Sequence, residues 1–62
     1  MKIDEIRTLK NGIEIVRDND SNGNKRYTAV DPKGYIGRTR IVESSCYLDT
    51  LRAIREYKDN NR

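Results

Sequence analysis

Apolar and polar residues alternate along much of the first two thirds of the chain. The alternation is clearest over residues 13–17, 26–31 and 35–42. A period of two residues is typical of a strand that buries one of its faces. The sequence therefore predicts three strands, near residues 13–17, 26–31 and 35–42.

The apolar spacing becomes helical after residue 44. Five apolar residues follow at successive intervals of one or three positions: Tyr47, Leu48, Leu51, Ile54 and Tyr57. Residues three and four positions apart lie on the same side of an α-helix. Two serines, Ser44 and Ser45, precede this segment and are typical helix-capping residues. We predict one amphipathic helix over residues 46–58, with residues 59–62 frayed.

Asn11-Gly12 marks a turn near the amino terminus. A two-residue hairpin turn at this position places Thr8 opposite Ile15. With this register one face holds four residues: Ile6, Thr8, Ile13 and Ile15. The alternative is a short helix over residues 2–10 that ends at Asn11-Gly12, because glycine is common just after a helix. The strand is the favoured interpretation of residues 1–12, and the helix remains open.

Asp31-Pro32-Lys33-Gly34 is the second hairpin signal, with proline and glycine at positions that favour a turn. A three-residue loop with a glycine bulge places Ala29 opposite Gly37. One face of the hairpin then holds Tyr27, Ala29, Tyr35 and Ile41. The other face holds Arg26, Thr28, Val30, Ile36, Arg38, Arg40 and Val42.

These elements predict an α+β fold, in which an antiparallel β-meander of three or four strands is packed on one face by a C-terminal α-helix. The 62 residues form one small domain. The chain contains no Phe and no Trp, so its core must consist of Ile, Leu, Val and Tyr. A core this small leaves a homodimer open as a source of further stability.

Cysteine, histidine and charge content restrict the chemistry and the partners. One cysteine and no histidine form neither an internal disulfide nor a usual zinc site, and we expect no cofactor. No apolar run exceeds three residues, which predicts a cytoplasmic protein without a membrane segment. The net charge of +3 is compatible with DNA, RNA or an acidic protein as partner and requires none of them.

Catalysis has little support in the sequence. Cys46 and Ser45 lack a histidine that could act as their general base. We expect Cys46 to pack against the core and the protein not to be an enzyme.

The sequence DNDSNGNK at residues 18–25 raises the question of a calcium site. Its first six residues match the opening of a calcium-binding loop. Position twelve, which requires a bidentate Glu, is Ala29, and Lys25 and Arg26 add positive charge nearby. The same residue types also favour exposed turns. We interpret the segment as a hairpin loop, with a weak calcium site as the alternative.

The second face of the predicted hairpin is basic. Arginine side chains suit phosphates and guanine edges, and β-strands can enter the major groove of DNA. Arg26 opposite Arg40 would be repulsive unless a carboxylate or an anionic partner lies between them.

We therefore predict a non-enzymatic nucleic-acid-binding module, and six residues are its candidate contacts: Arg26, Arg38, Arg40, Arg7, Ile36 and Val42. The alternative is a protein-binding regulator or inhibitor, of the kind found in phages and mobile elements. Such a protein would occupy the surface of an acidic host protein.

Residues along most of the chain resemble the small YegP-like domain of bacteria. The matching residues are Ile13-Glu14-Ile15 with Asp18, then Gly34 with Ile36 and Thr39, and finally Ser44-Ser45 with Ile54, Lys58 and Asn60. The resemblance covers about residues 13–60 and implies a strand-hairpin-strand-helix unit. The activity of that family is itself uncharacterised, so the resemblance implies no site.

Overall fold

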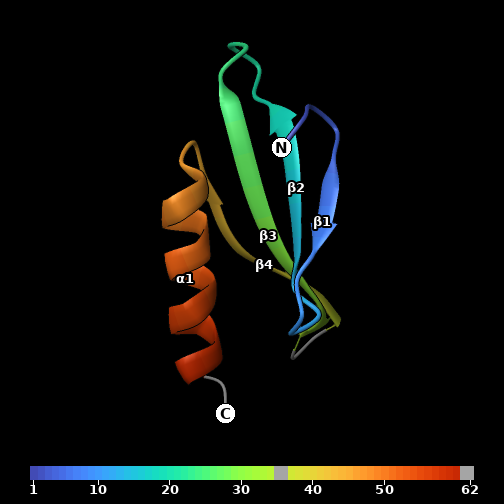
Figure 1. The fold of residues 1–62 in the computed structure, drawn as a ribbon, viewed down its shortest axis with the longest axis vertical. Coiled ribbons are helices and arrows are strands. Elements are labelled where there is room, and N and C mark those ends of the chain that lie inside the picture. Colours follow the sequence, from blue (N-terminus) through green and yellow to red (C-terminus); the bar gives the residue numbers. More distant parts are fainter. Residues whose placement is uncertain (35–36, 61–62) are drawn as a thin grey trace.

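The structure, a computed structural model, describes residues 1–34 and 37–60. Within these residues it contains four strands followed by one helix (Figure 1): β1 (Ile6–Thr8), β2 (Glu14–Asn19), β3 (Lys25–Gly34), β4 (Gly37–Ser44) and α1 (Tyr47–Asn60). The strands form one antiparallel sheet in the order β1-β2-β3-β4. Helix α1 lies along one face of this sheet, over β3 and β4. The predicted α+β meander with a C-terminal helix is confirmed.

We call the sheet face that α1 covers the inner face and the opposite one the outer face. Five buried residues form the core between the inner face and the helix: Ile13, Ile15, Tyr27, Ala29 and Ile54. Thr50 of α1 is also fully buried. Its hydroxyl donates to the Cys46 carbonyl at 2.9 Å, so this polar group is satisfied within the helix.

The first hairpin has a three-residue loop instead of the predicted two-residue turn. The Leu9 N–H donates to the Ile13 carbonyl at 2.8 Å, and Gly12 adopts a φ of +89°. The extra loop residue shifts the register by one, so that Ile6 pairs with Val16 and Thr8 with Glu14. A one-residue shift moves every side chain of a strand to the other face. The prediction that Ile6 and Thr8 share a face with Ile13 and Ile15 was therefore wrong.

The second hairpin reverses later than predicted. Strand β3 continues through Pro32 to Gly34, and Gly34 pairs with Gly37. Pro32 lies beyond Val30, which pairs with the first residue of β2, so its missing N–H costs no hydrogen bond to that strand. The Asp31 carboxylate accepts the Lys33 N–H at 3.0 Å, and the pairing with β4 is irregular between Asp31 and Gly34. The predicted turn at residues 31–34 is thus an irregularity within the strand.

A β-bulge in β4 changes the face of the residue that follows it. Ala29 pairs with Val42, and Val30 pairs with Arg40, which leaves Ile41 as an extra residue at a β-bulge. Val42 therefore packs against the core from the inner face. Its predicted position on the outer face was wrong.

Candidate interaction site

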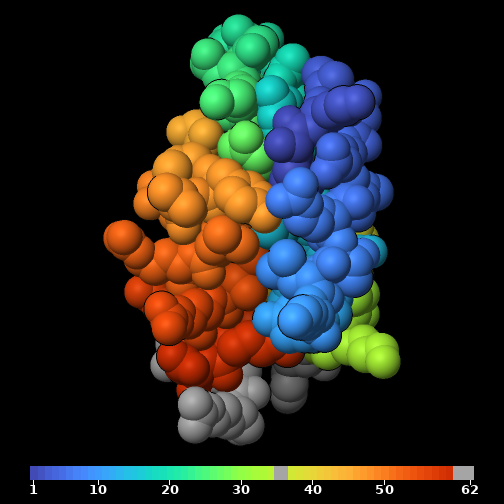
Figure 2. All heavy atoms as spheres, in the orientation of Figure 1, coloured from blue at the N-terminus to red at the C-terminus, as the bar shows by residue number. Residues whose placement is uncertain are grey.

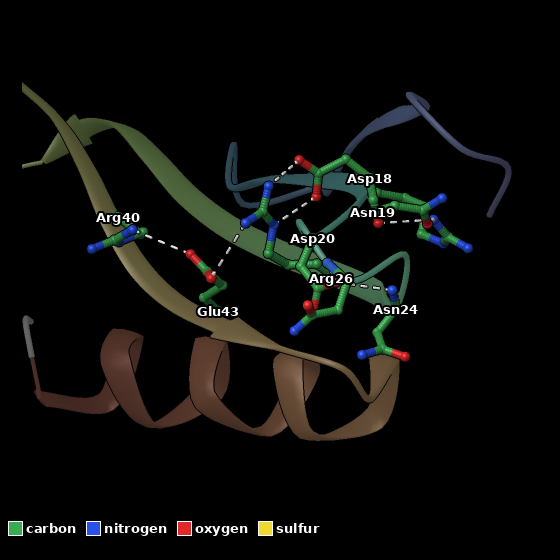
Figure 3. Close-up of polar contacts among 9 residues, drawn as sticks. Asp18, Asn19, Asp20, Asn24, Arg26, Arg40 and Glu43 are labelled. Atoms are coloured by element: carbon green, nitrogen blue, oxygen red, sulfur yellow. Dashed lines mark hydrogen bonds and ion pairs between the residues drawn. The ribbon is translucent and has the colours of Figure 1, made fainter.

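Three of the six predicted contact residues lie together on the outer face. Arg26 projects from β3, and Arg38 and Arg40 project from β4, on the side of the sheet away from α1. Figure 3 shows Arg26 and Arg40 on this side, with Glu43 between them. The prediction that these three arginines share a face is therefore correct, although the register that led to it was not.

Each of these arginines pairs with a carboxylate of the same face. Arg26 donates two hydrogen bonds to Asp18, from Nε at 2.9 Å and from Nη2 at 2.7 Å. Glu43 lies 3.7 Å from Arg26 Nη1 and 3.2 Å from Arg40 Nη1 (Figure 3). In addition, Arg38 Nη1 lies 3.0 Å from Glu14 Oε1. Three cations thus meet three anions, and the cluster is electrically neutral.

The pairing with Arg26 also affects protonation. The hydrogen bonds from its guanidinium lower the pKa of the Asp18 carboxyl below its ordinary value of 3.8. In return, the bonds to Asp18 raise the pKa of Arg26. Both groups are therefore charged at neutral pH, and a phosphate that approached Arg26 would have to displace a bidentate carboxylate.

Arg7 does not extend this cluster, because the register shift of β1 places it on the inner side of the sheet. Its Nη1 donates to the Tyr47 hydroxyl at 2.9 Å, and its guanidinium carbon lies 5.6 Å from the centre of the Tyr47 ring. The hydrogen bond to Tyr47 is the main cause of a raised Arg7 pKa. Arg7 links β1 to the first turn of α1. Of the remaining predicted contacts, Val42 is in the core, and Ile36 lies outside the described residues.

Residues 20–24 form the hairpin loop between β2 and β3, while Asp18, Asn19 and Lys25 belong to the paired strands. Asp20 Oδ1 accepts the N–H groups of Asn22 and Asn24, both at 2.9 Å, and Gly23 adopts a φ of +82°. Asp18, the first ligand of the calcium alternative, is hydrogen-bonded to Arg26. In the part of the chain that the structure describes, no three Asp, Glu, Cys or His residues gather as a metal site would require.

Cys46 is exposed at the start of α1. The expectation that it packs against the core was wrong. Its carbonyl accepts hydrogen bonds from the N–H and the hydroxyl of Thr50, so the residue contributes to the first turn of the helix through its backbone.

The sequence interpretation missed a groove between α1 and the β1–β2 hairpin. The groove has a volume of about 650 Å³, and nine residues line it: Leu9, Asn11, Leu48, Leu51, Arg52, Ile54, Arg55, Lys58 and Asp59. It exists because α1 lies over β3 and β4 and only borders the first hairpin. Figure 2 shows the hairpin, in blue, beside the helix, in orange and red. We call this groove between α1 and the β1–β2 hairpin the helix–hairpin groove.

The lining of the groove combines apolar side chains with cations. Leu9, Leu48, Leu51 and Ile54 supply the apolar part, and Leu48 is 71% exposed. Arg52, Arg55 and Lys58 oppose a single carboxylate, that of Asp59. Within residues 1–34 and 37–60, neither Arg52 nor Arg55 forms an ion pair or a side-chain hydrogen bond. The groove therefore has a net positive charge, unlike the outer face.

A signal for this groove was present in the sequence. Leu48, Arg52 and Arg55 are spaced by four and three residues, so they share one side of α1. The sequence interpretation assigned Leu48 to the apolar stripe of the helix. That stripe consists of Tyr47, Leu51, Ile54 and Tyr57, and Leu48 lies beside it.

No protein-family model, curated protein or solved structure matches this chain. The resemblance to the YegP-like domain stays a prediction. Among the described residues, no helix is both long and apolar enough to cross a membrane. The function must therefore be inferred from the two surfaces themselves.

Proposed function

We propose that this protein is a non-enzymatic module that binds a segment of a partner protein in the helix–hairpin groove. The observation that carries the proposal is the apolar lining of the groove, in which Leu48 is exposed and Leu9 and Leu51 are partly buried. An apolar surface rimmed by polar residues is characteristic of interaction sites. Its volume of about 650 Å³ is also within the range of binding pockets, roughly 300–1,000 Å³.

The charge distribution favours this function over nucleic-acid binding through the outer face. Affinity for nucleic acid rests on cations that neutralise phosphates. Arg26, Arg38 and Arg40 already have carboxylate partners at 3.2 Å or less. The repulsion between Arg26 and Arg40 that suggested an anionic partner is relieved by Glu43 of the same chain. Nucleic-acid binding by this face stays a prediction with weaker support.

A module of this kind would act by occupying a surface of its partner, as a regulator or an inhibitor does.

The proposal is tested by selecting displayed peptides of unbiased sequence against the immobilised protein. We expect selected peptides to shift the amide resonances of Leu9, Leu48 and Leu51 in the labelled protein. The variant Leu48→Gln should weaken their binding about tenfold or more, because burial of a leucine is worth roughly 1.5–3 kcal/mol. The matched control is Ile6→Gln, which changes an exposed apolar residue of the outer face and should leave binding unchanged.

Two results would contradict the proposal. One is that the selected peptides bind wild type and Leu48→Gln equally. The other is that no peptide is enriched while DNA or RNA oligonucleotides shift the resonances of Arg26, Arg38 and Arg40. The second result would support nucleic-acid binding instead.

A further inference from the structure

The composition of the groove identifies the chemistry of its occupant. We propose that the helix–hairpin groove binds an acidic amphipathic α-helix of a partner protein. This inference rests on the proposed function and narrows the partner to one class of segment.

The first argument is the charge along α1. Arg52, Arg55 and Lys58 follow one another at intervals of three residues, so they span about 9 Å along the helix at 1.5 Å per residue. Arg52 and Arg55 lack carboxylate partners in the described part of the chain, whereas the arginines of the outer face have them. Guanidinium groups bind carboxylates with two parallel hydrogen bonds. The unsatisfied cations therefore favour Glu and Asp side chains.

The second argument is the apolar lining. Leu48 and Leu51 are three residues apart on α1, and Leu9 faces them from the hairpin. An occupant that buries this lining needs apolar side chains on one of its sides and charged side chains along the border. A helix with apolar residues at positions i, i+3 or i+4, and i+7 has this arrangement.

The third argument concerns the backbone of the occupant. One wall of the groove is α1, whose own N–H and C=O groups are paired within the helix except at its two ends. The lining therefore offers a guest few backbone donors or acceptors, and polar groups buried without partners are costly. A helical guest satisfies its backbone internally. The lining extends from Leu48 to Asp59, about 16 Å at 1.5 Å per residue, and matches about three turns of a guest helix.

The same charges argue against a second copy of this chain as the occupant. The side of its one described helix that carries Leu48 also carries two cations, Arg52 and Arg55, and one carboxylate, Asp59, with Asp49 and Glu56 exposed beside them. In the groove of another copy, Arg52 and Arg55 would meet the cations of the lining, and these carboxylates would offset only part of the repulsion. A different chain, with carboxylates and no cations on that side, is therefore the better match.

The test uses three displayed libraries of 14-residue peptides with the full-length protein as bait. Two share a helical pattern with randomised apolar residues at positions i, i+4 and i+7, and they carry either Glu and Asp or Lys and Arg at the flanking positions. The third library is unbiased. We expect binders that depend on Leu48 mainly from the acidic library, and we expect them to gain helical circular dichroism on binding.

Substitutions in the protein show which arginines contribute to the affinity for acidic peptides. Arg52→Gln and Arg55→Gln should each weaken the acidic peptides about two- to fivefold, as expected for rim ion pairs. The matched control, Arg38→Gln with Arg40→Gln, lowers the net charge on the outer face by the same amount as the pair of groove variants. It should leave affinity at physiological salt nearly unchanged.

The outcomes separate this inference from the proposed function. If the unbiased or basic library yields Leu48-dependent binders as readily as the acidic one, the groove binds protein but the inference about charge is overturned. Peptides that bind in an extended conformation would overturn the inference that the occupant is a helix. If no library yields a Leu48-dependent binder, both proposals fail. A dimer in analytical ultracentrifugation that Leu48→Gln dissociates would show that a second copy is the occupant, and would also overturn the inference.

Discussion

At the scale of single residues, the carboxylates near an arginine decide whether its charge is available to a partner. Arg26 holds Asp18 through two hydrogen bonds and lies within 3.7 Å of Glu43. Arg52 and Arg55, on α1, have no ion pair with any other described residue. The formal net charge of +3 is therefore spread unevenly. The neutral cluster lies on the outer face, and a net positive charge lies beside the groove.

The pairing of Asp18 with Arg26 predicts a pH dependence of stability. The pKa of Asp18 is lowered in the folded chain, so its contribution is complete above about pH 5. The contribution is lost as the pH falls below 3.8 toward the folded pKa. We expect Asp18→Asn to reduce the free energy of unfolding at pH 7, and the difference from wild type to shrink as the pH falls from 5 to 2.5. Urea denaturation over this range measures the effect.

Arg26→Gln serves as the control, because it removes the same interaction from the other side. Its difference from wild type should shrink over the same pH range. A difference that is constant with pH for both variants would show that the pair does not favour the ionised carboxylate.

Gly34 is a residue at which a side chain is sterically excluded. A Cβ atom added there would overlap the Thr39 hydroxyl and would lie 2.6 Å from Thr39 Cβ and 2.8 Å from the Gly37 carbonyl oxygen. We expect Gly34→Ala to cost roughly 1–3 kcal/mol, as overpacking does. The measurement is urea denaturation of the single variants and of the double variant with Thr39→Gly.

The double variant tests the cause. In the Thr39→Gly background the cost of Gly34→Ala should fall, because most of the overlapping atoms are gone. Gly23→Ala is the comparison, since Gly23 has a positive φ and open space around it; its cost should be independent of Thr39. An equal cost of Gly34→Ala in both backgrounds would contradict the steric explanation.

At the scale of the element, helix α1 has two neighbouring sides that differ in burial. One side inserts Ile54 and Thr50 into the core, and the adjacent side presents Leu48, Arg52 and Arg55 to the groove. A helix that only covered the sheet would not need an apolar residue that is 71% exposed. Along α1, burial thus separates Ile54, which contributes to folding, from Leu48, which we propose to contribute to binding.

An alanine series along α1 tests this division. We expect Ile54→Ala to cost roughly 2–5 kcal/mol, because Ile54 is buried in the core. Leu51→Ala should cost less, about 1–2 kcal/mol, because Leu51 is partly exposed at the groove. Leu48→Ala should lie within about 0.5 kcal/mol of wild type. Chemical denaturation of the three variants provides the ranking.

One outcome of this series would contradict the proposed binding role of Leu48. If Leu48→Ala destabilised the protein as much as Ile54→Ala, Leu48 would be packed in solution. The groove would then be closed and unable to bind a partner.

At the scale of the whole molecule, the two faces differ in what they offer to a partner. The outer face carries equal numbers of paired arginines and carboxylates. The groove combines the exposed Leu48 with two arginines, Arg52 and Arg55, that have no ion pair among the described residues. The fold produces this difference by covering only part of the inner face with a single helix.

The neutral outer face predicts weak binding of nucleic acid. Duplex or single-stranded oligonucleotides should bind no more tightly than is typical of non-specific contacts, roughly 10⁻⁴–10⁻⁶ M at physiological salt. Replacing Glu14 and Glu43 by Gln should tighten the binding, because it frees Arg38 and Arg40. Fluorescence anisotropy as a function of salt measures both effects.

The triple variant of Arg26, Arg38 and Arg40 to Ala completes this test. If these side chains contacted phosphates, the slope of log affinity against log salt would fall by about 0.7–0.9 for each lost contact. If the slope fell by two to three units in the triple variant, the result would contradict the proposed function. It would support nucleic-acid binding as the main activity.

The sequence by itself determined the fold class, the helix and three of the four strands, because these depend on patterns within short segments. Alternation over residues 13–17 and helical spacing over residues 47–57 need no knowledge of distant contacts. The absence of histidine, and a single cysteine, restricted the chemistry at the same stage. Even Leu48, Arg52 and Arg55 could have been recognised as one side of the helix.

Only the tertiary structure decided which side chains meet. One extra residue in the first loop moved Arg7 from the outer side of the sheet to Tyr47, and the β-bulge at Ile41 turned Val42 toward the core. The pairing of Glu43 with Arg26 and Arg40 depends on the same register. Strand register is set by loop length and by packing across the sheet, and because side chains alternate with a period of two, an error of one residue inverts a face. The position of α1 over β3 and β4, which leaves the groove open, likewise depends on contacts between segments far apart in the chain.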